Sequence, residues 1–187
     1  MNDCSARIIL QARDIVPIVK RLRREKKRIV LTQGSFDLVH IGHARYCDKA
    51  REYGDVLIVG VDSDAKVRQR KGSNRPIVPE DERMEMLTHL RSVDYVVLKE
   101  AGGERFGLIK LIKPDVLVAT AQTYDEKTIK NLEKFCGKVV VLDPMATTST
   151  TAKIRLMQIN TARKIEDRMR TKLIKSIEEV LEELRNN

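Results

Sequence analysis

The chain has 187 residues, of which 42% are hydrophobic and 34% charged, enough for one domain with its own core. Apolar runs fall short of the roughly 20 residues that a membrane-spanning helix needs, and the N-terminus lacks a signal-peptide pattern. The three cysteines are widely spaced and form no CxxC pair, which suits a reducing compartment better than a disulfide framework. We therefore expect a soluble cytoplasmic protein with no membrane contact.

The net charge of +9 is concentrated in the flanking segments. Residues 1–28 hold nine Lys/Arg and three Asp/Glu, and residues 152–187 hold nine and six, whereas the middle of the chain is neutral. A basic patch can bind nucleic acid. Aromatic platforms for bases are scarce, however, because the chain has four Tyr, three Phe and no Trp. We interpret the basic segments as solvated helix faces and do not expect a nucleic-acid partner.

Residues 5–27 predict one or two amphipathic helices. Pro17 marks a start or a kink. We treat residues 1–27 as an N-terminal helical extension. Its apolar positions recur with a period near 3.6 and are Ile8, Ile9, Ile15, Ile18, Val19 and Leu22.

Apolar strands then alternate with helical segments. Continuous apolar strands joined by helices are typical of a buried parallel sheet. The pattern predicts an α/β, Rossmann-like, doubly wound fold over residues 28–156, with a five-stranded, mainly parallel sheet and helices on both faces. The expected strands are 29–32, 56–61, 95–98, 116–119 and 138–142, and the expected helices are 42–53, 79–91, 104–112 and 125–136.

The last segment, 162–185, predicts an uninterrupted helix, and we treat residues 157–187 as a C-terminal helical unit. Its apolar stripe must pack on the domain or on a second subunit. Together with the N-terminal helix it leads us to expect a homodimer. The stripe consists of Ile165, Met169, Leu173, Ile174, Ile177, Val180, Leu181 and Leu184.

The segment Gly34–His43 joins the first strand to a helix through a glycine turn. The first N–H groups of a helix are unpaired and carry partial positive charge, so this junction is a natural anion site. The pair His40-x-x-His43 has three interpretations: a metal pair with Cys47, two buried structural histidines, or two imidazoles that face phosphate oxygens. An obvious carboxylate ligand is missing, and the glycine turn favours the phosphate interpretation.

The string Gly34-Ser-Phe-Asp-x-x-His-x-Gly-His43 resembles the HxGH signature of the cytidylyltransferase-like nucleotidyltransferase superfamily. The resemblance covers roughly residues 28–156 and is closest to the ADP-heptose synthase (heptose 1-phosphate adenylyltransferase) branch. Glycerol-3-phosphate and ethanolamine-phosphate cytidylyltransferases are near relatives. Further matching segments follow in the family's order: Tyr53–Asp64, Arg70-Lys-Gly72, Arg75-Pro76, Glu82-Arg83-Met84, Ser92–Val97 and Ser149-Thr-Thr151.

The resemblance implies a role for each matched residue. The catalytic set, which would contact phosphate, is His40, His43, Arg83 and Arg51. The nucleotide-binding set is Gly34, Ser35, Phe36, Asp37, Gly42, Ser149, Thr150 and Thr151. The acceptor-binding set is Asp62, Asp64 and Lys71, with Lys71 in a flexible loop that acts as a lid. We expect no metal held by the protein itself; Mg²⁺ would accompany the nucleoside triphosphate (NTP).

The implied reaction transfers a nucleoside monophosphate (NMP) from an NTP to a phosphorylated small acceptor, a sugar phosphate such as heptose 1-phosphate, and releases pyrophosphate. One alternative is a CTP-dependent enzyme acting on glycerol-3-phosphate or another phospho-alcohol or phosphonate. A second is a catalytically degenerate nucleotide-binding regulator. Class I aminoacyl-tRNA synthetases share the string His-Ile-Gly-His, but a KMSKS-like element is missing here.

The loop Ala119–Tyr124 departs from the family pattern. Relatives carry a glycine and an aspartate in this loop, near the base and the acceptor, and this chain has neither. The sequence therefore leaves open the choice between ATP and CTP and the identity of the acceptor.

Overall fold

The computed structural model describes residues 5–120, 124–143, 145 and 150–185. The chain divides into two compact units, residues 1–147 and 148–187. Within the described residues, no helix is both long enough and apolar enough to cross a membrane.

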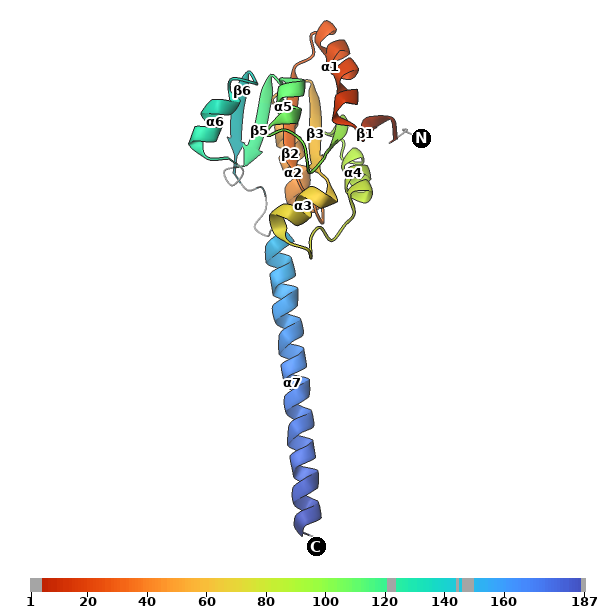
Figure 1. Ribbon diagram of the computed structural model, residues 1–187, viewed down its shortest axis with the longest axis vertical. Helices are drawn as coiled ribbons and strands as arrows, with labels where there is room; N and C mark the ends of the chain where they lie inside the picture. The colour runs from red at the N-terminus through yellow and green to blue at the C-terminus, as the bar shows by residue number, and fades with distance from the viewer. Residues whose placement is uncertain (1–4, 121–123, 144, 146–149, 186–187) are drawn as a thin grey trace. The chain divides into compact units, whose positions relative to one another are not determined.

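A parallel sheet forms the centre of the first unit (Figure 1). Its order is β1-β4-β3-β2-β5-β6, and every pair of neighbours is parallel. The predicted α/β fold with a parallel sheet is confirmed, but the predicted number of strands is wrong, because the sheet has six. The strands are β1 (Ile8–Ile9), β2 (Ile29–Gly34), β3 (Val56–Asp62), β4 (Tyr95–Lys99), β5 (Val116–Thr120) and β6 (Lys138–Leu142).

The sixth strand is β1, which the sequence analysis assigned to a helix. Ile8 and Ile9 pair with Val96 and Val97 of β4. The guanidinium group of Arg7 fixes this strand by donating hydrogen bonds to the backbone oxygens of Thr88, Val93 and Asp94. Helix α1 (Ile15–Arg24) begins only after two short 3-10 turns. Two adjacent β-branched residues fit a helical stripe as well as a strand, and only the partner on β4 decides between them.

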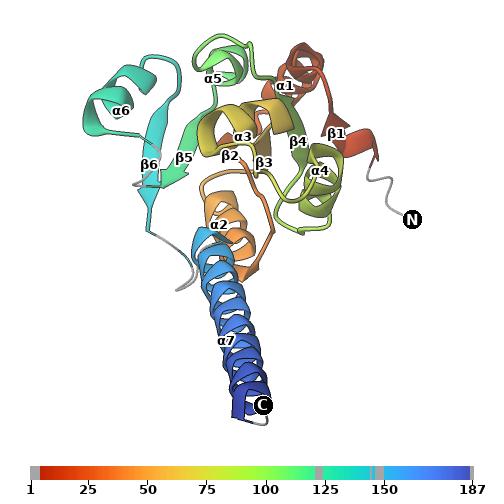
Figure 2. The ribbon, with the colours of Figure 1, turned by 60° about the horizontal axis from the view of Figure 1, so that its bottom comes forward.

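Helices cover both faces of the sheet (Figure 2). Helices α2 (Ile41–Arg51) and α4 (Glu80–Thr88) bury Tyr46, Cys47, Met84 and Leu87 in the core on one face. Helices α1, α5 (Gly107–Ile112) and α6 (Glu126–Leu132) pack on the other face, where Ile15, Ile109 and Leu132 are buried. Both faces of the strands are therefore apolar, as the continuous runs in the sequence predict.

Helix α3 (Asp64–Lys71) directly follows β3 and was not predicted. The Ser63 hydroxyl caps it by accepting a hydrogen bond from the Lys66 N–H at 3.3 Å. Lys71 is thus the last residue of a helix, and the prediction of a flexible loop at this position is wrong. The helix shows little periodicity because Val67 alone among its residues is buried.

The sheet order places β2 between β3 and β5. The chain runs outward from β2 to β3 and β4, then returns to form β5 on the other side. This reversal is a topological switch point, where ligands of open parallel sheets bind beyond the carboxyl ends of the strands. The Gly34–His43 segment follows the carboxyl end of β2.

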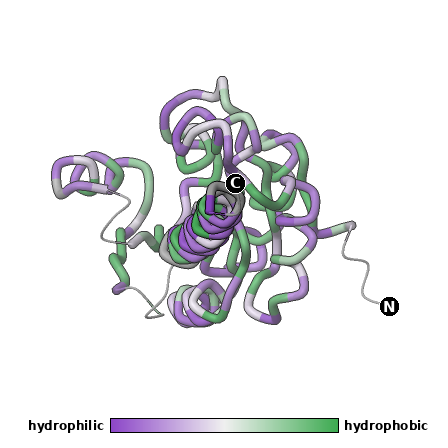
Figure 3. Tube along the Cα trace, turned by 90° about the horizontal axis from the view of Figure 1, so that it is seen from below, coloured by the Kyte–Doolittle hydropathy of each residue, from purple (hydrophilic) through white to green (hydrophobic). Residues whose placement is uncertain are grey.

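The second unit consists of helix α7 (Thr150–Arg185), which has 36 residues. Hydrophobic and hydrophilic residues alternate along it (Figure 3).

Candidate active site

A strained turn connects β2 to α2. Phe36 and Leu38 have φ angles of 49° and 52°, in the left-handed region that non-glycine residues seldom adopt. A Cβ on Gly34 would lie 3.1 Å from the Phe36 ring, so a larger residue there would displace the ring. The turn brings His40 to the N-cap position of α2.

Two backbone hydrogen bonds set the orientation of both imidazoles. The Gly42 N–H donates to His40 Nδ1 at 3.1 Å, and the His40 N–H donates to His43 Nδ1 at 3.3 Å. A neutral imidazole that accepts at Nδ1 carries its proton on Nε2. The ring centroids are 4.2 Å apart. The start of α2 therefore presents two neighbouring Nε2–H donors.

His43 is uncharged at neutral pH. Its pKa is lowered from 6.5 to about 4 by burial, by the neighbouring His40 and by Lys71, with Asp37 acting in the opposite direction. The ring also contacts Phe36, with the centroids 5.5 Å apart. A buried neutral donor of this kind can stabilise charge that develops on a substrate oxygen.

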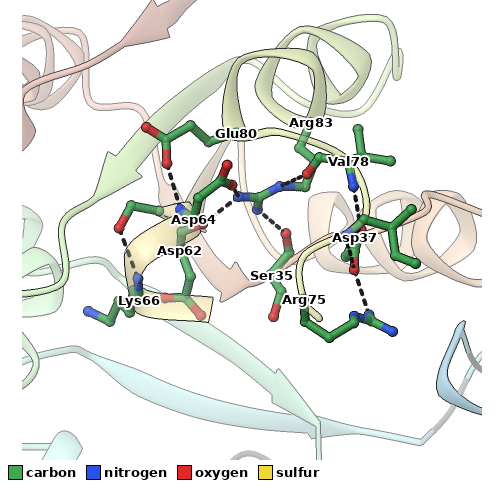
Figure 4. A network of polar contacts seen from close by, with 11 residues as sticks. Ser35, Asp37, Asp62, Asp64, Lys66, Arg75, Val78, Glu80 and Arg83 are labelled. Carbon is green, nitrogen blue, oxygen red and sulfur yellow. Dashed lines mark hydrogen bonds and ion pairs between the residues drawn. The ribbon is translucent and has the colours of Figure 1, made fainter. Parts of the chain in front are cut away.

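Asp37 ties the turn to the loop that precedes α4 (Figure 4). Its buried carboxylate accepts hydrogen bonds from the N–H groups of Ile77 and Val78 at 3.1 Å and pairs with Arg75 at 2.6 Å. The Arg75 side chain is only 12% exposed, and its Nε finds no hydrogen-bond partner among the described residues. Asp37 thus holds the loop, and the loop places Arg75 beside Asp37, which itself interacts electrostatically with His43.

Arg83 is buried and does not present its guanidinium group to a ligand. Its Nε donates to the Val78 oxygen at 2.9 Å, and Nη1 donates to the Ser35 oxygen. Nη2 donates to the Asp62 oxygen at 2.9 Å and to Asp64 Oδ1 at 2.7 Å. Four of its five N–H donors are therefore engaged with the protein. The expected direct contact with phosphate is replaced by a link between the turn after β2, the end of β3 and α4.

The carboxylates of Asp62 and Asp64 are also engaged. Asp62 pairs with Arg70 at 2.6 Å and with Lys99 at 3.0 Å, and Asp64 pairs with Arg83. Burial lowers the pKa of Lys99, and the bond to Asp62 opposes that shift. These two aspartates therefore position cations at the carboxyl edge, and the sequence analysis assigned a role to neither Arg70 nor Lys99.

Two arginines gather around Lys71, which interacts electrostatically with His43. The pKa of Lys71 is lowered by partial desolvation and then by Arg75 and Arg70, while Asp37 and Asp62 oppose this shift. The same lysine lowers the pKa of His43. An anion that binds among these groups would offset the repulsion that lowers the pKa of Lys71. This cluster of Arg70, Lys71 and Arg75, which we call the cation cluster, fits a phosphate group.

The structure does not bring Arg51 to this site. Arg51 ends α2, eight residues and about 12 Å along the axis from His43. Its guanidinium group pairs with Asp94 at 3.2 Å and donates to the Gly54 oxygen. Gly54 and Asp94 precede β3 and β4, so Arg51 lies at the amino edge of the sheet.

Some predicted residues cannot be placed. Ser149 and residues 121–123 of the Ala119–Tyr124 loop lie outside the described residues. Thr150 and Thr151 are the first residues of α7 in the second unit, and their side chains also lie outside the description. Among the residues that are described, no three His, Cys, Asp or Glu gather in a way that could hold a metal ion.

A family model described as cytidylyltransferase-like matches residues 31–162. The chain belongs to the cytidylyltransferase-like family. The resemblance seen in the sequence is thereby confirmed, and the matched range includes the turn after β2, both histidines and the cation cluster of this cytidylyltransferase-like protein.

Curated relatives carry the name bifunctional protein HldE. The HldE of Nitratiruptor sp. is 43% identical over 145 residues, which are 78% of this chain and 31% of the relative. The HldE of Helicobacter acinonychis is 45% identical over 108 residues, which are 58% and 23% of the two chains. The cytidylyltransferase-like chain thus spans about a third or less of the length of these relatives.

Solved structures support the same fold. A lipopolysaccharide core biosynthesis protein from Thermoplasma volcanium superposes with a TM-score of 0.56 at 28% identity, over 62% of this chain and 96% of that one. A pantoate-beta-alanine ligase from Francisella tularensis superposes with a TM-score of 0.55 at 18% identity, over 73% and 66% of the two chains. The similarity to the ligase shows only that the two proteins share a fold.

Proposed function

We propose that this chain transfers an NMP from an NTP to a phosphorylated small acceptor and releases pyrophosphate. The observation that carries the proposal is the pair of Nε2–H donors at the start of α2, 4.2 Å apart by ring centroid, in a cytidylyltransferase-like chain. We further propose a sugar phosphate as the acceptor. The resemblance to the heptose 1-phosphate adenylyltransferase branch and the identity to HldE proteins support that choice.

The histidine pair would act on the α-phosphate. An acceptor oxygen attacks the α-phosphorus in line with the leaving pyrophosphate, and negative charge spreads over the non-bridging oxygens. His40 and His43 donate hydrogen bonds to those oxygens, and the N-terminus of α2 adds its partial positive charge. The acceptor phosphate is already largely ionised at pH 7, so the reaction needs no general base.

The cation cluster would hold the acceptor's phosphate. Arg70 is positioned by Asp62 and Arg75 by Asp37, each at 2.6 Å. Lys71 completes the cluster at the end of α3. A guanidinium group fixed by one carboxylate keeps other N–H donors for a phosphate, and the buried Nε–H of Arg75 has no hydrogen-bond partner among the described residues. The nucleophile would therefore lie close to the two histidines.

Mg²⁺ would enter as part of the NTP substrate. The carboxylates of Asp37, Asp62 and Asp64 are paired with arginine or lysine side chains, so they fit a role in positioning cations better than a role as metal ligands. Magnesium usually keeps several waters and binds through substrate phosphates. It would neutralise charge on the departing pyrophosphate.

A substrate panel tests the proposal. Pyrophosphate release is measured for ATP and CTP, each combined with sugar 1-phosphates, including heptose 1-phosphate, and with glycerol-3-phosphate. We expect release with one nucleotide and a sugar phosphate. His43→Ala should lower turnover by about 10²–10³-fold, as loss of an oxyanion donor does.

His89→Ala is the matched control, because His89 is the remaining histidine and its side chain is 58% exposed at the end of α4. It should keep wild-type turnover. Tight NTP binding without release for any pair would contradict the proposal and favour the degenerate regulator. Full turnover in His43→Ala would contradict the assigned role of the histidine pair.

A further inference from the structure

A buried carboxylate at the end of β3 is shared by two cations. The Asp62 side chain is 1% exposed, and each of its oxygens has its own partner. Oδ1 accepts a hydrogen bond from Lys99 Nζ at 3.0 Å, and Oδ2 accepts one from Arg70 Nη1 at 2.6 Å. Arg83 donates to the backbone oxygen of Asp62, not to its carboxylate (Figure 4). The side chains of Asp62, Lys99 and Arg70 together therefore carry one net positive charge.

The sheet and a glycine position the Lys99 side chain. Lys99 ends β4 and lies in register with Asp62 on β3, so the two side chains share one face of the sheet. Gly60 lies two residues before Asp62 on that face, and a Cβ there would be 2.9 Å from Lys99 Cδ. The glycine thus leaves room for the lysine stem. Because the Lys99 side chain is only 17% exposed, its position favours contact with Asp62 over direct contact with a ligand.

Arg70 binds the same carboxylate from the solvent side. It lies in the last turn of α3, next to Lys71, and its side chain is 57% exposed. The hydrogen bond to Asp62 uses one of its five N–H donors. The net positive charge of the three side chains is therefore available at the exposed end, within the cation cluster.

Lys99 determines how much of Arg70 is left for a ligand. A buried carboxylate with a single cationic partner would draw Arg70 into a bidentate pair and cancel its charge. With Lys99 on one oxygen, Arg70 shares only the other. We propose that Lys99 is a positioning residue for acceptor binding, which acts through Asp62 to keep the charge and the donors of Arg70 available to the acceptor's phosphate. This inference rests on the proposed function of the cation cluster.

Steady-state kinetics of Lys99→Met test the inference with the substrates found in the panel. The variant leaves Asp62 and Arg70 with no net charge, so the KM for the sugar phosphate should rise about tenfold. The kcat and the KM for the NTP should change less than about twofold, because the histidine pair is untouched. Lys66→Met is the matched control: Lys66 lies one turn before Arg70 on α3, and its Nζ donates to the Glu100 oxygen at 3.3 Å. It should leave all three constants near their wild-type values.

A charge-matched double variant separates positioning from direct contact. Asp62→Asn combined with Lys99→Met removes the carboxylate and its inner cation together, so the single positive charge stays on Arg70. The introduced amide oxygen can still accept a hydrogen bond from Arg70. We expect the KM for the sugar phosphate to return to within about threefold of the wild-type value, because the two changes compensate each other.

Three outcomes would overturn the inference. The first is an unchanged KM for the sugar phosphate in Lys99→Met, and the second is an equal rise for both substrates. The third is a double variant that binds the acceptor as weakly as Lys99→Met, since Lys99 would then contact the phosphate itself. If Lys99→Met does not fold, the double variant decides alone, because it buries no unpaired charge and a tenfold loss of acceptor binding in it would have the same meaning.

A binding measurement separates this test from that of the proposed function. Inorganic phosphate is titrated into each protein by isothermal titration calorimetry at low ionic strength, which needs no turnover. Its dissociation constant should rise in Lys99→Met and recover in the double variant. That pattern in a protein that turns over no substrate pair would support the role of Lys99 and contradict the proposed function. Turnover with equal phosphate binding in all three proteins would do the reverse.

Discussion

The tautomers of two histidines follow from two backbone hydrogen bonds. Each Nδ1 accepts an N–H from the first turn of α2, so neither ring can place its proton elsewhere while it stays neutral. The HxGH spacing is what makes this possible, because it puts one imidazole at the N-cap and the other in the first turn. The sequence predicted the phosphate-facing role, but the fixed tautomers could be seen only in the structure.

The lowered pKa of His43 predicts a dependence of stability on pH. In the unfolded chain His43 titrates near 6.5, whereas in the folded chain it titrates at about 4. Between these values the unfolded chain binds more protons, so the free energy of unfolding falls as the pH drops from about 6.5 to 4. Above about 6.5 the contribution of His43 does not change.

The measurement is the free energy of unfolding by urea at several pH values, for the wild type and for His43→Asn, which has no titrating side chain. We expect a smaller loss of stability between pH 6.5 and 4 in the variant. Parallel curves for the two proteins would show that His43 titrates normally in the folded chain.

At the scale of elements, buried ion pairs hold the loops that build the site. Arg83 connects the turn after β2, the end of β3 and α4 through four hydrogen bonds, and Asp37 fixes the loop before α4. These residues are charged and dispersed along the chain, so the sequence suggested ligand contacts for them. In the structure these side chains instead hold the neighbouring loops and charged groups in place.

The buried position of Arg83 predicts a large effect on stability. Arg83→Met keeps much of the volume but leaves Asp64 and three backbone oxygens without their donor, so we expect a loss of about 3–5 kcal/mol in the free energy of unfolding. Arg91→Met is the control, because the Arg91 side chain is 90% exposed and its loss should cost under about 0.5 kcal/mol. Chemical denaturation measures both losses, and equal losses in the free energy of unfolding for Arg83→Met and Arg91→Met would contradict the structural role of Arg83.

Sequence periodicity predicted the strands of five or more residues and failed for the short elements. Five apolar runs appear as β2 to β6, because each is long enough to carry a pattern. β1 has two residues and depends on its partner β4, and α3 buries one residue, so neither carries a readable pattern. Arg51 was misplaced for a related reason: its residue type matched the family, but a helix of eleven residues carries it to the other edge of the sheet.

At the scale of the whole molecule, the parallel strands place the candidate catalytic and binding residues at the carboxyl edge of the sheet. The loops after β2 and β3 bring the histidine pair and the cation cluster together there, as the switch-point rule predicts from strand order. The first residues of α7 begin a second unit. The contribution of Ser149, Thr150 and Thr151 to phosphate binding therefore stays a prediction from the resemblance.

Labelled NTP tests the central claim most directly, which is attack at the α-phosphorus. The nucleotide identified by the substrate panel is supplied with ³²P at either the α or the γ position, together with the active sugar phosphate. We predict that the α label enters the sugar product and that the γ label leaves in pyrophosphate. Transfer of the γ label to the sugar phosphate would contradict the account.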